Sequence, residues 1–145
     1  MTYWDTSCLL KLYTPEENSE HLTALAEAER GPLHTSVLAE TEMAFALARK
    51  ESLGALRRGG AQYLFTAFRH DVALARLRLI PLDQGVRDKA VELAQTCLLR
   101  APPLALRTLD GLHLATAATI RARILQTSDL RLRTAAAALG FQIRG

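Results

Sequence analysis

Acidic residues stand at the ends of short apolar segments in four separate parts of the chain. Asp5 follows "TYW", and Asp129 lies two residues after "ILQT". Asp110 lies near the start of an apolar helical segment, "RTLDGLHLATA", and Glu40 and Glu42 lie near the start of another helical segment. A carboxylate beside apolar residues is costly to bury unless something pairs with it. These acids therefore need either a polar partner or a metal ion.

A shared pocket is the chemical interpretation of this pattern. Clustered carboxylates repel one another and raise one another's pKa values, so such a pocket needs a cation. Oxygen ligands without accompanying Cys or His favour Mg²⁺ or Mn²⁺ over Zn²⁺. Such an ion suits phosphodiester hydrolysis, because it can activate a water and screen the charge on the attacked phosphate. For Asp110 taken alone, the favourable charge at a helix N-terminus is a sufficient explanation.

Strand-like and helix-like segments alternate along the chain. Strands are expected at residues 2–5, 32–36, 77–81, 124–128 and 141–143. Helices are expected at residues 7–13, 17–30, 37–50, 61–74, 84–100, 107–117 and 130–139. Thr35 or Ser36 is the expected N-cap of the third helix, Asp83 that of the fifth, and Gly140 the C-cap of the last. This alternation predicts a parallel sheet covered on both faces, with ligands bound beyond the carboxyl ends of the strands.

Length and composition are typical of one globular domain spanning residues 1–145. Apolar residues make up 49% and charged residues 23% of the chain. We find no signal peptide and no membrane-spanning run, so we expect a cytoplasmic protein with no membrane partner. Cys8 and Cys97 lack ligand spacing and are expected to be reduced core thiols. The net charge of +3 and the pI near 9.2 are compatible with a polyanionic partner.

Four segments of the chain, in order from residue 3 to residue 143, are "YWDTSCLLKLY", "TSVLAETEMAFAL", "LDGLHLATA" and "TSDLRLRTAAAALGF". They resemble, in the same order, the four motifs of PIN-domain ribonucleases, most closely the VapC-type toxins of bacterial toxin–antitoxin pairs. The resemblance implies a three-layer α/β/α sandwich with a central parallel sheet of about five strands. It also implies a metal-dependent endoribonuclease that forms a homodimer and is neutralised by a small antitoxin protein. Carried over by position, the catalytic and metal-binding acids are Asp5, Glu42, Asp110 and Asp129.

Helical phase does not decide between Glu40 and Glu42, since each shares a helix face with apolar residues. The family pattern has the acid six residues after the serine that ends the second strand, followed by an apolar residue and then an Ala-Leu pair. Counted from Ser36, that position is Glu42. The resemblance therefore favours Glu42, with Glu40 kept in reserve.

Several neighbours of the acids have more than one interpretation. His113 could be a general base, but we expect a packed or hydrogen-bonded histidine, and we expect Trp4 in the core. Hydroxyl side chains that could orient a ligand carboxylate or merely cap helices are Thr6, Ser7, Thr127 and Ser128. Basic residues that could contact RNA phosphates, or merely lie on solvated helix faces, are Arg57, Arg58, Arg107, Arg121, Arg123, Arg131 and Arg133.

The sequence thus predicts an endoribonuclease that uses Mg²⁺, with Mn²⁺ as a possible substitute, and needs no nucleophilic side chain. One alternative is a non-catalytic RNA- or protein-binding module on the same fold. A weaker alternative is a receiver-type signalling domain, which also gathers acids at strand ends and binds Mg²⁺. That class needs a lysine near the end of a later strand, and the C-terminal half contains only Lys89, in the middle of an expected helix.

Overall fold

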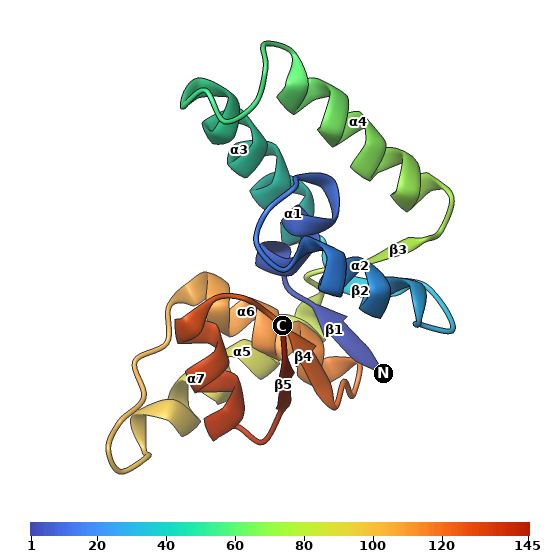
Figure 1. Cartoon of the computed structure of the whole chain (residues 1–145). Coiled ribbons are helices and arrows are strands. Elements are labelled where there is room, and N and C mark those ends of the chain that lie inside the picture. Colours follow the sequence, from blue (N-terminus) through green and yellow to red (C-terminus); the bar gives the residue numbers. More distant parts are fainter.

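The computed structural model describes residues 1–145 and contains five strands and seven helices (Figure 1). The strands are β1 (Thr2–Trp4), β2 (Leu33–Ser36), β3 (Leu77–Ile80), β4 (Ile124–Gln126) and β5 (Gln142–Arg144). The helices are α1 (Thr6–Tyr13), α2 (Ser19–Glu27), α3 (Leu38–Ser52), α4 (Gly60–Ala73), α5 (Gln84–Leu98), α6 (Thr108–Thr119) and α7 (Leu130–Ala138). The order of elements matches the predicted alternation of strands and helices.

All five strands are parallel and follow the order β3-β2-β1-β4-β5. The chain moves outward from β1 to β3 and then returns to the other side of β1 to form β4. The order therefore reverses between β1 and β4, and ligands of open parallel sheets bind outside the carboxyl ends of the strands at such a reversal. Asp5 follows β1 directly, and Asp129 follows β4 after a short loop.

Two hydrophobic cores cover the two faces of the sheet. Tyr3 and Trp4 are consecutive on β1 and so point to opposite faces. Trp4 belongs to a core that includes buried residues of α1, α2, α3 and α4, whereas Tyr3 belongs to one that includes buried residues of α5, α6 and α7. Figure 1 shows these two groups of helices on either side of the sheet. This arrangement confirms the predicted three-layer α/β/α sandwich.

The predicted core positions are also found. Trp4 is buried, and Cys8 and Cys97 are buried and form no disulfide. None of the helices combines the length and the apolar character needed to cross a lipid bilayer.

The predicted N-cap of α3 is wrong. The N-cap is Val37 and makes no side-chain cap, whereas we expected Thr35 or Ser36. The Ser36 hydroxyl still accepts a hydrogen bond from the backbone N–H of Leu38, at 3.3 Å. Ser36 thus satisfies one free N–H at the helix start, although it lies one residue outside the cap position.

Other predicted ends are shifted for identifiable reasons. The first strand stops at Trp4, because Asp5 caps α1 by accepting the N–H of Ser7. The second helix is shorter than residues 17–30, since Asn18 adopts a left-handed φ of 69° at its start. Gly140 is not the C-cap of α7 but follows it, with the φ of 91° that favours glycine at that position. The remaining predicted ends move by one or two residues.

Candidate active site

A cavity of about 640 Å³ lies at the carboxyl ends of the strands and is lined by the four predicted acids. These are Asp5 at the start of α1, Glu42 on α3, Asp110 on α6 and Asp129 at the start of α7. Glu40 does not line the cavity, and its carboxylate lies 3.6 Å from the Arg69 guanidinium. The fold therefore brings four distant segments together and places Glu42, not Glu40, among them.

Asp5 is held by a set of hydroxyl groups. Its Oδ2 accepts hydrogen bonds from the Ser7 hydroxyl at 2.6 Å, the Ser7 backbone N–H at 3.3 Å and the Thr127 hydroxyl at 2.9 Å. Its Oδ1 makes no hydrogen bond within the protein and lies 3.9 Å from His113 Nε2. Two of the four flanking hydroxyl residues thus orient Asp5 through one oxygen and leave the other oxygen unused.

Asp129 is oriented in the same manner. Its Oδ1 caps α7 by accepting the backbone N–H groups of Arg131 at 2.8 Å and Leu132 at 3.1 Å. The Thr127 hydroxyl that donates to Asp5 also accepts the N–H of Asp129, at 3.1 Å, and so couples the two acids. The predicted Ser128 hydroxyl contacts Cys8 Sγ at 3.3 Å rather than a carboxylate.

Glu42 receives two side-chain hydrogen bonds on a single oxygen. His113 Nε2 lies 2.9 Å from Glu42 Oε2, and the Thr6 hydroxyl donates to the same oxygen. Burial favours the neutral acid, but the hydrogen bonds from His113 and Thr6 and the attraction to His113 outweigh it, so the pKa of Glu42 is lowered. Glu42 is therefore held as a carboxylate, with Oε1 free of protein partners.

A common pattern links the four acids. Asp5, Glu42 and Asp129 each use one oxygen for orienting hydrogen bonds, and Asp110 uses neither. Each acid thus presents at least one unpaired oxygen in a cavity that all four line. As placed, no three Asp, Glu, His or Cys side chains are grouped closely enough to hold a metal ion. The arrangement supplies a set of hard oxygen donors rather than a closed coordination shell.

The pKa of Asp110 is raised, as expected for a carboxylate in a pocket of like charges. Burial raises its pKa most, the negative charges of Asp129 and Asp5 raise it further, and Arg107 and His113 oppose the rise. Repulsion between the acids predicts a raised pKa from the sequence alone, but burial of Asp110 is the larger cause of the rise. A raised pKa means that the folded state binds more protons than the unfolded state. The metal-free protein should therefore lose stability as pH rises from the aspartate value of about 3.9 through the raised folded value.

Asp110→Asn should consequently make the metal-free protein more stable at pH 7. We expect a gain of about 1 kcal/mol or less, since water screens this partly exposed group. The rise in Tm should then be at most about 4 °C. Thermal melting of both proteins in EDTA at pH 7 measures the difference. A lower Tm for the variant would mean that Asp110 acts mainly through the α6 N-terminus, where a carboxylate is favourable by about 0.3–1 kcal/mol.

An aromatic ring and a guanidinium at this cavity were not predicted from the sequence. Phe45 and Arg49 line it together with Glu42, and the Phe45 side chain is 79% exposed. They follow Glu42 by three and seven residues on α3, a spacing that places all three on one helix face. With Glu42 as the acid, this spacing is the sequence pattern that could have predicted Phe45 and Arg49. None of the seven arginines proposed from the sequence lines the cavity.

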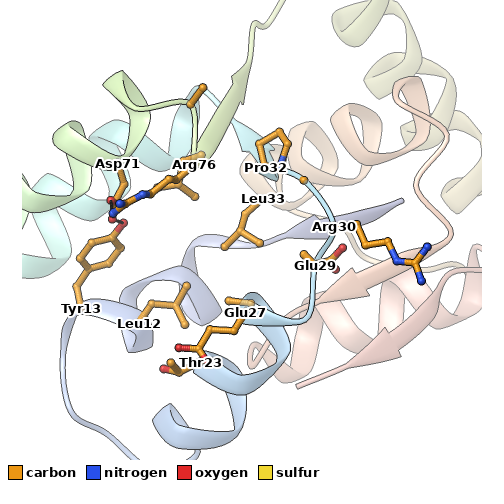
Figure 2. Close-up of a pocket in the computed structure, with 14 residues that line it drawn as sticks. Leu12, Tyr13, Thr23, Glu27, Glu29, Arg30, Pro32, Leu33, Asp71 and Arg76 are labelled. Carbon is orange, nitrogen blue, oxygen red and sulfur yellow. Dashed lines mark hydrogen bonds and ion pairs between the residues drawn. The ribbon is translucent and has the colours of Figure 1, made fainter.

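A larger cavity, of about 740 Å³, lies at the other end of the sheet (Figure 2). Leu33 and Leu77, at the amino ends of β2 and β3, help to line it. One of its carboxylates, Asp71, already accepts hydrogen bonds from the Tyr13 hydroxyl at 2.8 Å and from Arg76 at 3.0 Å. Size alone would favour this cavity, but its two carboxylates without protein partners, Glu27 and Glu29, are neighbours in sequence, whereas the smaller cavity gathers four acids from separate segments. We therefore place the candidate site at the carboxyl ends of the strands.

Comparison with known proteins bears on the family. The PIN domain family model matches residues 2–138. The chain belongs to the PIN domain family. Ribonuclease VapC46 of Mycobacterium tuberculosis is 34% identical over 143 residues, which cover 97% of this chain and 94% of the relative. Ribonuclease VapC47 of the same species is 33% identical over 146 residues, covering 97% and 93%. This family membership excludes the receiver-type alternative.

Solved structures of this PIN-domain fold support the same architecture. A crystal structure of FitAcB from Neisseria gonorrhoeae matches with a TM-score of 0.70 and 17% identity, covering 100% of this chain and 97% of that one. VapBC2 from Rickettsia felis, bound to a DNA fragment from its promoter, matches with a TM-score of 0.65 and 18% identity, covering 99% and 98%. At these identities the likeness concerns the fold alone.

Proposed function

We propose that this PIN-domain protein is a divalent-metal-dependent endoribonuclease and the toxin of a type II toxin–antitoxin pair. The observation that carries the proposal is the cavity lined by Asp5, Glu42, Asp110 and Asp129, each with an unpaired carboxylate oxygen. The ribonuclease names of two full-length relatives support the proposed activity. In this proposal residues 1–145 act as a single nuclease domain in the cytoplasm.

The metal would be Mg²⁺, with Mn²⁺ as a substitute, and the four acids would hold it. The donor set fits, because it consists of carboxylate oxygens, the ligands that these hard cations prefer. When bound, such an ion activates water for attack on a phosphodiester and screens the negative charge that develops there. The hydroxyls of Ser7 and Thr127 donate hydrogen bonds to Oδ2 of Asp5, and the Thr6 hydroxyl donates one to Oε2 of Glu42. These hydrogen bonds fix the orientation of the two carboxylates. The protein thus prepares its ligands before the ion arrives.

RNA would enter over the face of α3 that borders the acids. Arg49 supplies a guanidinium that can bind a phosphate, and phosphate contacts provide most of the affinity for nucleic acids. The exposed Phe45 ring can stack on a base in the manner of proteins that bind single strands. A cation and an aromatic ring next to the acids are therefore placed to guide a strand to the metal.

We also propose a homodimer that a small antitoxin neutralises. Two of the solved neighbours are named as the VapBC2 assembly and as a toxin–antitoxin complex from Klebsiella pneumoniae, the latter with a TM-score of 0.58 and 22% identity over 89% of this chain. Exposed apolar side chains such as Leu53 and Tyr63 offer surface for association. Sedimentation can test the dimer, and a stable monomer at micromolar concentration would count against it.

The cleavage proposal is tested with purified protein and RNA. Cleavage is expected in Mg²⁺ or Mn²⁺, and loss of cleavage in EDTA, with recovery when the ion is restored in excess. Single-stranded and structured RNA should both be offered, with DNA as a comparison substrate. Cleavage that persists in EDTA would contradict the metal mechanism, and RNA binding without cleavage in either ion would favour a non-catalytic binding module.

A further inference from the structure

A hydrogen-bond chain connects β1, α6 and α3 and reaches the wall of the acid cavity. The Tyr3 hydroxyl oxygen lies 2.5 Å from His113 Nδ1, and His113 Nε2 lies 2.9 Å from Glu42 Oε2. Tyr3 is fully buried, and the His113 side chain is only 3% exposed. These three residues are far apart in the sequence, so the chain exists only in the folded protein. It ends on one of the four candidate ligands.

Tyr3 and Glu42 together engage both ring nitrogens of His113. The backbone N–H of Ser36 donates to the Tyr3 hydroxyl oxygen, at 3.1 Å. A neutral His113 accepts the Tyr3 hydroxyl hydrogen at Nδ1, and a protonated His113 donates its Nδ1–H to the Tyr3 oxygen; in both cases Nε2 carries a hydrogen. That Nε2–H donates to Glu42 Oε2. The contact with Tyr3 at Nδ1 thus leaves the Nε2–H of His113 to hold the carboxylate.

The hydrogen-bond chain restricts the Glu42 side chain, which could otherwise adopt several conformations. Glutamate has several rotatable bonds, and it loses that freedom when its carboxylate binds a ligand. His113 and Thr6 together hold Oε2 from two elements, and Oε1 remains without a protein partner. A carboxylate that is oriented in advance binds its ligand more tightly, because less ordering accompanies binding.

We propose that His113, held by Tyr3, is a positioning residue that presents Glu42 to the divalent cation. The inference rests on the proposed function for the identity of that ligand. His113 does not act as a general base, because it is buried and both ring nitrogens are engaged. His113 influences cation binding only by orienting Glu42. The alternative is that His113 merely fills a buried polar position in the packing of α6.

The test compares variants that remove or keep the donor. His113→Leu removes both hydrogen bonds at similar volume, His113→Gln keeps an amide donor, and Tyr3→Phe removes only the hydroxyl. Tyr13→Phe is the matched control, since its hydroxyl donates to Asp71, away from the acid cavity. Thr116→Val controls for disturbance of α6, because Thr116 is buried there and bonds only to the Leu112 carbonyl.

Three quantities are measured on each folded variant: Mn²⁺ affinity by calorimetry without RNA, Tm in EDTA, and kcat and KM for RNA cleavage. His113→Leu should weaken Mn²⁺ binding and lower kcat by about 10–100-fold, the usual effect of removing a residue that orients a metal ligand. KM for RNA should stay near that of the wild type. His113→Gln should recover part of the loss, and Tyr3→Phe should weaken Mn²⁺ binding more than Tyr13→Phe does.

The outcomes separate this inference from the function on which it rests. Unchanged Mn²⁺ affinity in folded His113→Leu, or an equal loss in Thr116→Val, would overturn it. If His113→Leu fails to fold, the same comparison is made between Tyr3→Phe and Tyr13→Phe, and equal affinities would overturn the inference. A wild type that binds Mn²⁺ but cuts no RNA would refute the nuclease proposal, while weaker Mn²⁺ binding in Tyr3→Phe would still support the role of the chain.

Discussion

Asp110→Asn is expected to reduce RNA cleavage by about a hundredfold or more while the protein stays folded. Asp110 lines the cavity with both carboxylate oxygens free of hydrogen bonds, so its charge is available to a cation. Asparagine keeps the shape but loses the charge. Removing a residue that only orients a ligand costs about 10–100-fold, and removing a ligand itself should cost at least as much. Cleavage of a defined RNA in saturating Mg²⁺ measures the loss.

A matched control comes from another aspartate at a helix start. Asp83 caps α5 by accepting the Val86 N–H at 2.9 Å and does not line the acid cavity. Asp83→Asn should leave cleavage unchanged, since asparagine is as good an N-cap as aspartate. Asp5→Asn should behave like Asp110→Asn. Near-normal cleavage by a folded Asp110→Asn variant would remove Asp110 from the proposed site.

Glu42→Gln is expected to reduce cleavage by about tenfold or more, whereas Glu40→Gln should leave it within about twofold. Glu42 lies in the cavity with two hydrogen bonds on Oε2, and glutamine keeps an acceptor there while losing the charge. Glu40 instead lies near Arg69 in an exposed ion pair, which contributes little. Rates for both variants at equal Mg²⁺ concentration make the comparison. A larger loss for Glu40→Gln would mean that the side of α3 facing the metal has been misassigned.

The placement of Asp5 and Asp129 could be predicted because it follows from local patterns and one topological rule. Each follows a short apolar strand, and the carboxyl ends of parallel strands meet at one edge of the sheet. The structure adds a helix-capping role for both residues, so the capping and ligand interpretations are compatible. The order of the strands could not be predicted in the same way, because pairing depends on how helices pack between distant strands.

The choice between Glu40 and Glu42 could not be made from helical phase. Both lie near the start of α3, and the outcome depends on which face of that helix meets α6. The structure places Glu42 in the cavity, in contact with His113, which lies 71 positions away in the sequence. The Tyr3–His113 pair could not be predicted for the same reason. In the sequence Tyr3 is an ordinary strand residue, and only the packing of α6 on the sheet brings His113 to its hydroxyl.

The central claim is that the carboxylates of one cavity hold the metal ion that RNA cleavage requires. Anomalous diffraction from a crystal of the wild-type protein soaked in Mn²⁺ tests it most directly. We predict an anomalous peak in the acid cavity, with carboxylate oxygens of Asp5 and Asp110 at about 2.0–2.6 Å, the range for Mg²⁺-like and Ca²⁺-like oxygen coordination. The peak should be absent from Asp110→Asn treated in the same way. A cavity without a peak at a Mn²⁺ concentration that supports full cleavage, or a peak only elsewhere, would contradict the claim.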